Sequence, residues 1–301
     1  MTSERESIER GEPALLILGC GYLGRRLARH YMDLGVTVLG VVASESSRRT
    51  LLDEGIPAIA VDLASADLAV LPLTGRAVFH LAPPPGQGVE DWVTRRLAAA
   101  FARQGHPRRL VYISTSGVYG DCGGAWVDET WPVRPSADRA RRRWDAEQAL
   151  RQWRRASGAA LVVLRVAGIY GPGRLPLERI RQGLPLVRES QAPFSNRIHV
   201  DDLAQACVAA MERGSDGEIY NVCDDYPSTM TDYFFQIADA AGLPRPPVIP
   251  ISEMEGQLSP GMRSYMRESR RLSNRKLRDE LGVTLTYPAL KDGLPGALGR
   301  R

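Results

Sequence analysis

The sequence predicts an α/β protein built on a doubly wound parallel sheet, followed by a smaller C-terminal α/β lobe. Two observations predict the sheet. Apolar runs of strand length alternate with helical segments over the first 170 residues, and the first run leads directly into a Gly-x-Gly-x-x-Gly turn at residues 19–24. After about residue 170, repeated prolines interrupt this alternation, which indicates a region of different organisation.

The first strand–turn–helix unit is the most informative segment of the chain. Ala14 to Leu18 has the length of a strand, and apolar residues from Leu23 to Tyr31 recur at helical spacing. Between them, Gly19 permits a tight turn, Gly21 lets backbone approach a pyrophosphate, and Gly24 lets the helix pack closely on the strand. The N–H groups and dipole at the helix start favour an anion. The alternative interpretation is an ordinary strand–helix turn.

The later elements follow in alternation. Further strands are expected at residues 36–42, 57–61, 77–82, 110–114 and 161–166, with helices at 46–54, 89–104 and 137–156. Toward the C-terminus we expect a strand entering a helix over 197–213, a strand at 218–222, a helix near 229–241, a proline-rich connector at 244–250 and one basic helical segment at 262–281. Such a sheet binds ligands beyond the carboxyl ends of its strands.

The domain boundaries follow from this pattern. We expect a nucleotide-binding domain over residues 12–170, to which part of 198–222 returns. Residues 171–197 and 223–301 would then form the smaller substrate-binding lobe.

Composition restricts the functional classes. The apolar runs fall far short of the roughly 20 residues that a membrane helix needs, and the charged residues 1–10 lack the apolar core of a signal peptide. We therefore expect a cytoplasmic protein with no membrane partner. The four cysteines form no Cys-x-x-Cys pair and the four histidines are dispersed, so no metal site is expected.

The net charge of +4 does not indicate a nucleic-acid partner. Only Lys276 and Lys291 among the 39 basic residues are lysines, so the basic character is an arginine bias. The arginines are mixed with acidic residues and no ladder of alternating aromatic and basic residues accompanies them. A small-molecule substrate is the expected partner.

Six segments in order resemble the extended short-chain dehydrogenase/reductases, the group of NAD-dependent epimerases and dehydratases. They are Gly19-Cys-Gly-Tyr-Leu-Gly24, Phe79-His-Leu-Ala82, Ser114-Thr-Ser-Gly-Val-Tyr-Gly120, Arg165-Val-Ala-Gly-Ile-Tyr-Gly-Pro-Gly173, Ile198-His-Val-Asp-Asp-Leu-Ala204 and Glu218-Ile-Tyr-Asn-Val222. The Pro83-Pro-Pro85 extension is similar to an atypical branch of the family. The resemblance implies a Rossmann sheet that binds NAD or NADP.

The resemblance also implies roles for individual residues. The pyrophosphate would be held by Gly19, Gly21, Tyr22, Leu23 and Gly24, the adenine by Asp62 and Leu63, and the ribose and nicotinamide side by Leu81, Ala82 and Pro83. Ala167 also counts among the expected cofactor-binding residues. Thr115 falls where the family places a hydroxyl that bonds the substrate, although a hydroxyl at a strand end also satisfies local backbone. The His199-Val-Asp-Asp202 motif would be architectural, with helix capping by Asp201 or Asp202.

The catalytic pair of the family is altered in this chain. The family carries Tyr and Lys at positions i and i+4 of the helix after the fifth strand, and the lysine lowers the pKa of the tyrosine for proton exchange. Counting back from Ala146-Glu147 places Arg143 at the lysine position and Arg139 at the tyrosine position. A guanidinium replaces lysine in binding a ribose hydroxyl and supplying charge, and Arg143 therefore counts among the cofactor-binding residues as well. Arginine stays protonated and cannot replace the tyrosine as an acid–base.

The segment after the second strand bears on the choice of cofactor. Ser44, Ser46, Arg48 and Arg49 are suited to hold the 2′-phosphate of NADP, whereas Glu45 lies two or three residues beyond the position of an acid that selects NAD. The alternative is a capped helix start with Ser46 as N-cap. The sequence favours NADP over NAD.

These observations lead to two main hypotheses. The first is an NAD(P)-dependent oxidoreductase or epimerase-like enzyme acting on a small hydroxyl or carbonyl substrate, sugar-linked or not, with Thr115, Arg139 and Arg143 at its catalytic site. Tyr119 and Tyr170 are alternative proton carriers. The second is a non-catalytic NAD(P)-binding redox sensor or regulator; an interaction module without nucleotide is a third. The resemblance suggests a homodimer through the helices that flank the fifth strand.

Overall fold

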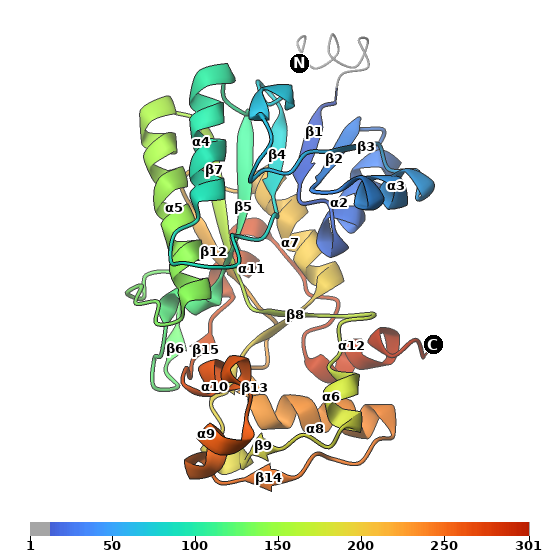
Figure 1. Ribbon diagram of the computed structural model, residues 1–301, viewed down its shortest axis with the longest axis vertical. Helices are drawn as coiled ribbons and strands as arrows, with labels where there is room; N and C mark the ends of the chain where they lie inside the picture. Colours follow the sequence, from blue (N-terminus) through green and yellow to red (C-terminus); the bar gives the residue numbers. More distant parts are fainter. Residues whose placement is uncertain (1–12, 301) are drawn as a thin grey trace. The chain divides into compact units, whose positions relative to one another are not determined.

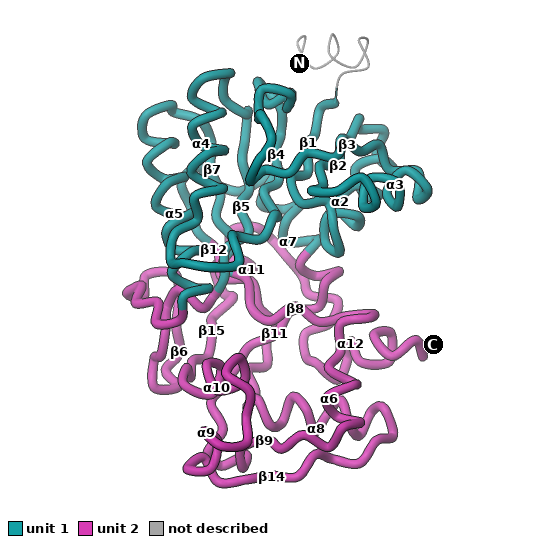
Figure 2. The backbone as a smooth tube through the Cα atoms, in the orientation of Figure 1, with its two compact units in different colours: residues 1–115, 138–165, 204–219 teal, residues 116–137, 166–203, 220–301 magenta. Residues whose placement is uncertain are grey.

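The computed structural model describes residues 13–300 and divides into two compact units, which Figure 2 colours separately. The first unit comprises the chain up to residue 115 together with 138–165 and 204–219, and the second comprises 116–137, 166–203 and the chain from 220 onward. Residues 116–137 thus belong to the second unit, whereas the sequence places them in the range 12–170. The domain boundaries themselves stay a prediction, and residue 12 and the charged segment 1–10 lie outside the described residues.

A seven-stranded parallel sheet runs in the order β12-β7-β5-β4-β1-β2-β3 (Figure 1). Its strands are β1 (Leu15–Leu18), β2 (Val38–Val42), β3 (Ala58–Ala60), β4 (Ala77–His80), β5 (Arg109–Thr115), β7 (Ala160–Val166) and β12 (Ile219–Val222). The predicted doubly wound sheet is confirmed. The strand order reverses between β1 and β4, and this reversal is where such sheets bind their ligands.

The helices that accompany these strands are α2 (Tyr22–Asp33), α3 (Glu45–Asp53), α4 (Trp92–Gln104), α5 (Asp138–Ser157) and α7 (Val200–Arg213), with a 3₁₀ turn η1 at Leu68–Val70. Figure 1 shows α4 and α5 side by side on one face of the sheet. Because both of its faces are covered, the strands are mainly apolar, and β1 and β4 are buried along their whole length. One prediction is wrong in detail: the N-cap of α3 is Ser44, whose side chain accepts from the Ser47 N–H, and not Ser46.

The second unit is assembled from short elements. They are η2 (Ser116–Tyr119), β6 (Trp126–Val127), β8 (Gly168–Tyr170), α6 (Leu177–Arg181), β9 (Leu186–Val187), η3 (Glu189–Gln191), β10 (Phe194–Ser195), β11 (Arg197–His199), β13 (Ser228–Thr229), α8 (Met230–Ala241), β14 (Val248–Ile249), η4 (Ile251–Glu253), α9 (Met254–Gln257), α10 (Pro260–Met266), β15 (Arg271–Leu272), α11 (Arg275–Leu281) and α12 (Leu290–Ala297). Its own apolar core forms around α8, where Phe234 and Ile237 pack with Leu290 of α12.

The basic segment 262–281 is not the single helix that the sequence predicts. It divides into α10, the strand β15 and α11. Arg271 and Leu272 pair in parallel with Trp126 and Val127 of β6, so partners about 145 residues away override the local helical preference. The helix α12 is absent from the prediction. The strands β13 and β14 are absent as well, because each has only two residues and can be recognised only through its partner strand.

The Asp202 carboxylate of the acidic pair that follows His199 has an architectural role, whereas helix capping by Asp201 or Asp202 stays a prediction. The Asp202 carboxylate accepts hydrogen bonds from the backbone N–H groups of Thr286 at 2.8 Å and Tyr287 at 2.9 Å. It therefore fastens the approach to α12 onto the start of α7.

Within residues 13–300, every helix is too short or too polar to span a lipid bilayer.

Candidate nucleotide-binding site

The turn between β1 and α2 requires its glycines for different physical reasons. Gly19 has a φ of +86°, and a Cβ built there would lie 2.5 Å from the backbone nitrogen of Ala82. A Cβ at Gly24 would lie 3.0 Å from Cγ2 of Ile17, so this glycine lets α2 approach β1. A Cβ at Gly21, by contrast, would meet nothing within 4 Å. Gly21 therefore faces open space, as expected where a ligand approaches the backbone.

Among residues 13–300, the start of α2 has no side-chain cap from its N-cap residue. Its N-cap is Gly21, which has no side-chain hydrogen bond, and its first turn contains no acidic residue. The neighbouring helices differ, because Ser44 caps α3 and Asp91 caps α4. An uncapped helix start beside an open glycine fits the pyrophosphate of a dinucleotide.

The residues that follow β4 pack against this glycine turn. The backbone of Leu81 and Ala82 lies directly against Gly19, and the Leu81 N–H donates to the carbonyl oxygen of Leu18 at 2.8 Å. The guanidinium of Arg143 on α5 donates to the carbonyl oxygen of Ala82 at 3.3 Å. The structure thus brings the glycine turn, the end of β4 and Arg143 together.

Arg143 is also attached to β5. It donates to the hydroxyl oxygen of Tyr112 at 3.2 Å, and its guanidinium lies 5.7 Å from the centre of that ring. Thr115 is the last residue of β5 and is half-buried, three residues beyond Tyr112. Arg139 lies one helical turn before Arg143 on α5 and is also half-buried. The predicted i, i+4 arrangement on one helix is present, while the catalytic roles of these residues stay a prediction.

Both alternative proton carriers are buried. Tyr119 is buried, and its hydroxyl donates to Oδ1 of Asn221 at 2.8 Å. Tyr170 is fully buried, with its ring packed edge-on against His199. Burial also raises the pKa of both Tyr170 and Tyr112, the latter to about 12.

A buried ionic cluster positions α5 against the sheet. Glu147 is fully buried and accepts from the Ser114 hydroxyl at 2.6 Å and from the Arg165 guanidinium at 2.9 Å. The cluster therefore joins α5 to β5 and β7. In the sequence, Glu147 served only to align Arg139 and Arg143 with the catalytic positions of the family. Its buried partners can be recognised only in the folded structure.

A second polar cluster, which the sequence analysis did not predict, lies at the end of β4. His80 is fully buried, and its Nε2 lies 2.9 Å from the Thr94 hydroxyl, which donates to Asp91. Burial, assisted by the Arg143 charge, lowers the pKa of His80 to about 3, so the imidazole is neutral. Burial raises the pKa of Asp91. The Asp-x-x-Thr spacing at the start of α4 is a capping signal that sequence reasoning could have used.

The residues predicted to surround the adenosine already have partners within the chain. Ser44 caps α3, while Arg48 donates to the Ala58 carbonyl oxygen at 3.1 Å and to Glu45 at 2.7 Å. Asp62 accepts from the Ala64 N–H and the Ser65 hydroxyl, and the hydroxyl lowers its pKa most. These bonds shape the loop after β3.

The other residues predicted to bind the cofactor are Leu63, Pro83 and Ala167, which lie close to these elements in the chain. The carbonyl oxygen of Leu63 accepts from Arg96 of α4, and Pro83 directly follows Ala82. Ala167 follows β7 and belongs to the second unit, so its part in cofactor binding stays a prediction.

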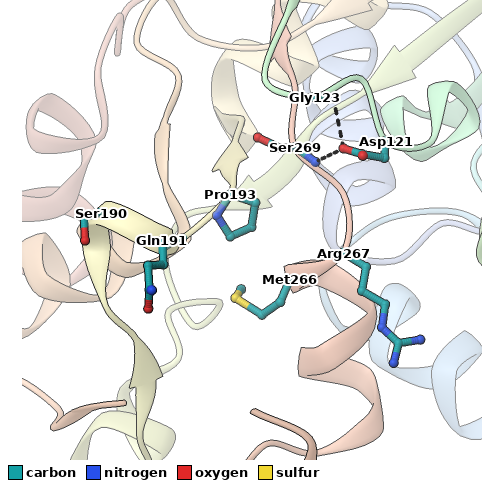
Figure 3. A pocket seen from close by; sticks show the side chains of 9 residues that line it. Asp121, Gly123, Ser190, Gln191, Pro193, Met266, Arg267 and Ser269 are labelled. Atoms are coloured by element: carbon teal, nitrogen blue, oxygen red, sulfur yellow. Dashed lines mark hydrogen bonds between the residues drawn. The ribbon is translucent and has the colours of Figure 1, made fainter. Parts of the chain in front are cut away.

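The second unit contains a cavity of about 320 Å³. It is lined by Asp121, Gly123, Ser190, Gln191, Ala192, Pro193, Met266, Arg267 and Ser269 (Figure 3). Oδ1 of Asp121 accepts from the backbone N–H groups of Ser269 at 2.9 Å and Gly123 at 3.1 Å. This carboxylate therefore joins the loop after η2 to the segment after α10.

The described residues contain no group of three or more His, Cys, Asp or Glu side chains suited to a metal ion. The four cysteines are free thiols, and three of them are buried.

A model of the NAD dependent epimerase/dehydratase family matches residues 15–223. The chain therefore belongs to this family, in agreement with the sheet order and the glycine turn described above. A curated relative from Streptomyces sp, a 3-diazoavenalumate denitrifying reductase, is 29% identical over 269 residues, covering 84% of this chain and 85% of its own.

Two solved structures extend the comparison. A functionally unknown conserved protein from Silicibacter pomeroyi DSS is 34% identical, with a TM-score of 0.78, covering 95% of this chain and 98% of its own. MoeE5 in complex with UDP-glucuronic acid and NAD is 25% identical, with a TM-score of 0.74, covering 95% and 97% respectively.

Proposed function

We propose that this protein is an NAD(P)-dependent oxidoreductase or epimerase-like enzyme that acts on a small hydroxyl or carbonyl substrate. The observation that carries the proposal is the contact between the Gly19 turn, Ala82 and Arg143. It joins the predicted cofactor cradle to the helix on which this family carries its catalytic pair.

The residues present fit a nicotinamide dinucleotide. The open face of Gly21 and the uncapped start of α2 would hold the pyrophosphate, and Leu81, Ala82 and Pro83 would line the ribose and nicotinamide side. When bound, the nicotinamide supplies or accepts hydride. Arg143 contributes a fixed positive charge next to Ala82 and keeps that charge at every working pH.

Proton transfer in this site must differ from the tyrosine pathway. Arg139 stands at the predicted tyrosine position and stays protonated, while Tyr112, Tyr119 and Tyr170 are buried. We propose that the Thr115 hydroxyl binds the substrate oxygen and that water carries the proton. Arg139 would stabilise negative charge that develops on the substrate.

A non-catalytic NAD(P) sensor is the second candidate. The burial of Tyr112, Tyr119 and Tyr170 favours it, because a buried tyrosine loses its proton less readily than an exposed one. The two candidates share the cradle and differ only in turnover.

A hydride-transfer screen separates them. Wild type, Thr115→Ala and Arg139→Tyr are mixed with reduced cofactor and a panel of small aldehydes and ketones, and absorbance of the reduced nicotinamide is followed. The enzyme predicts turnover that falls about a hundredfold in Thr115→Ala, since hydrogen-bonding and acid–base groups contribute about 10²–10⁴-fold. Thr50→Ala, which removes an exposed hydroxyl on α3, is the matched control.

The outcomes are distinct. Turnover unaffected by Thr115→Ala removes Thr115 from the site. Cofactor binding without turnover in wild type, combined with turnover gained in Arg139→Tyr, identifies the sensor and shows that the lost tyrosine is the reason.

The choice between NAD and NADP is part of the proposal. The sequence favours NADP through Ser44 and Arg48, whereas in the structure Arg48 is paired with Glu45. Glu45→Gln is therefore expected to strengthen NADP binding relative to NAD. Unchanged relative affinity would remove Arg48 from the cofactor site.

Two further predictions accompany the proposed function. We propose a homodimer formed through α4 and α5, which analytical ultracentrifugation tests directly. We also propose a cytoplasmic location, consistent with the free thiols of the described chain.

A further inference from the structure

The loop after β3, residues 62–66, folds around Asp62. Oδ1 of Asp62 accepts from the Ala64 N–H at 3.0 Å, and Oδ2 accepts from the Ser65 hydroxyl at 2.7 Å. The carbonyl oxygen of Asp62 also accepts from the N–H groups of Ser65 at 3.1 Å and Ala66 at 2.8 Å. Asp62 is therefore the centre of this turn.

One arginine of α4 holds the other side of the same loop. Arg96 donates from Nη1 to the carbonyl oxygen of Leu63 at 2.9 Å and from Nη2 to that of Ala66 at 2.8 Å. Nη1 also donates to the carbonyl oxygen of Ala64. A planar guanidinium suits such a set of acceptors, because its donors have a fixed fork geometry. Leu63 and Leu97 of α4 belong to one buried core, so apolar packing attaches the loop to α4 as well.

The loop lies where the strands of one half of the sheet end. β1, β2 and β3 are adjacent and parallel (Figure 1), so their carboxyl ends share one edge. A doubly wound sheet binds a dinucleotide across the reversal of strand order, with one mononucleotide unit over each half. The proposed function puts the nicotinamide beside residues 81–83, after β4. The adenosine then lies over the half in which β3 leads into residues 62–66.

The Asp62 carboxylate has acceptor capacity that a base can use. Within residues 13–300, the hydrogen bonds to this carboxylate come from Ala64 and Ser65, whereas an ionised carboxylate offers about four acceptor positions. Asp62 is half-buried rather than enclosed. The exocyclic amino group of adenine is a donor, and hypoxanthine has a carbonyl oxygen in its place. A carboxylate that reaches this position therefore favours adenine over hypoxanthine.

We infer that Arg96 is a positioning residue for the adenine half of the cofactor: by holding residues 62–66 against α4, it keeps the Asp62 carboxylate where it discriminates adenine from hypoxanthine. This inference rests on the proposed function, since it takes the ligand to be a nicotinamide dinucleotide. The guanidinium is engaged with the loop carbonyls, so Arg96 acts through Asp62.

The first test measures amide hydrogen exchange in the protein without cofactor. Arg96→Met removes the guanidinium but keeps an apolar stem, and Arg96→Lys keeps a charge without the fork. Arg103→Met is the matched control, because Arg103 is exposed and lies about two turns further along α4. Exchange at the amides of residues 64–66 should accelerate about tenfold in Arg96→Met and less in Arg96→Lys. It should stay unchanged in Arg103→Met.

The second test measures discrimination between bases by calorimetry. Each protein is titrated with NAD⁺, with its hypoxanthine analogue and with nicotinamide mononucleotide, which lacks the adenosine half. If wild type binds only NADP⁺, the 2′-phosphates of the two dinucleotides replace them. Wild type and Arg103→Met should bind the adenine dinucleotide about tenfold more tightly than the hypoxanthine one, the scale of a hydrogen bond to a charged group.

The Arg96 variants should lose this preference selectively. In Arg96→Met the ratio of the two Kd values should fall to about twofold, and Arg96→Lys should lie between it and wild type. The Kd for nicotinamide mononucleotide should stay within about twofold in every variant, because this ligand does not reach the loop. A general loss of folding would weaken all three ligands together.

A double-mutant cycle tests whether Arg96 acts through Asp62. Asp62→Asn removes the charge and should lower the ratio about as far as Arg96→Met does. Adding Asp62→Asn to Arg96→Met should then change the ratio by less than about twofold, because two residues that act through one network are not additive.

Four results would overturn the inference. They are equal binding of the two dinucleotides by wild type, unchanged exchange at residues 64–66 in Arg96→Met, an unchanged ratio in Arg96→Met, and additive effects of the Arg96 and Asp62 substitutions. The proposed function is judged on wild type alone, so the two can fail separately. Wild type that binds the dinucleotides without hydride transfer contradicts only the enzyme, whereas wild type that binds neither overturns both.

Discussion

At the scale of single residues, the glycines of the first turn divide into structural and ligand-facing positions. A side chain at Gly19 meets the backbone of Ala82 and also faces an unfavourable φ, whereas a side chain at Gly21 meets only open space. Sequence spacing predicted both roles, but only the structure shows which substitution the fold itself tolerates.

We therefore predict opposite profiles for two alanine variants. Gly21→Ala should keep the thermal stability of wild type and weaken NAD binding about tenfold, because its Cβ enters the space that the pyrophosphate needs. Gly19→Ala should lose about 1–3 kcal/mol or more of folding free energy from the left-handed φ and the clash. Differential scanning calorimetry and cofactor titration measure the two effects. Equal loss of stability in both variants would contradict the distinction.

His80 gives a prediction about pH. Its pKa is about 3 in the folded protein and 6.5 in the unfolded chain, so below pH 6.5 the unfolded state binds a proton that the folded state does not. Stability is therefore complete above pH 6.5 and declines as the pH falls toward 3. Between pH 6.5 and 5 the loss from this residue is about 2 kcal/mol.

Urea denaturation of wild type and His80→Gln over this pH range isolates the contribution. Glutamine retains an amide that bonds the Thr94 hydroxyl but does not titrate. The difference in unfolding free energy between the two proteins should shrink by about 2 kcal/mol from pH 6.5 to 5. A constant difference would show that His80 takes up its proton in the folded state as readily as in the unfolded chain.

At the scale of elements, α5 is the helix on which the proposed chemistry depends, and Glu147 holds it in place. Removing this carboxylate leaves the Arg165 guanidinium buried without its charge partner. We predict that Glu147→Ala loses about 3–5 kcal/mol of folding free energy. In Glu212→Ala, which breaks an exposed pair with Arg213, the change should stay within about 0.5 kcal/mol. Comparable small losses in both variants would refute the positioning role.

The elements also show where sequence patterns suffice. The strands of the sheet are short apolar runs that alternate with the helices α2 to α5, and their predicted positions agree with the structure to within a few residues. The segment 262–281 was predicted wrongly because β15 forms only through pairing with β6. Local propensity contains no information about a partner that distant.

At the scale of the whole molecule, family membership and the α/β sheet follow from six motifs that could be recognised in the sequence, and the match over residues 15–223 agrees. The candidate site was predictable only where residues lie within those motifs. The buried partners of Glu147 and the cluster of His80, Thr94 and Asp91 come from separate segments, and the cavity draws on three loops with no shared pattern. Such groups are assembled by the fold rather than by spacing.

The central claim is that the start of α2 forms a working dinucleotide cradle. Calorimetric titration of wild type and Gly21→Ala with NAD⁺, NADH, NADP⁺ and NADPH tests this claim most directly. We predict that wild type binds at least one of the four with a one-to-one stoichiometry. At a hundredfold excess over Kd, the bound cofactor should stabilise the fold by about 2.7 kcal/mol. Gly21→Ala should remain folded and bind about tenfold more weakly. A folded wild-type protein that binds none of the four cofactors would contradict the account.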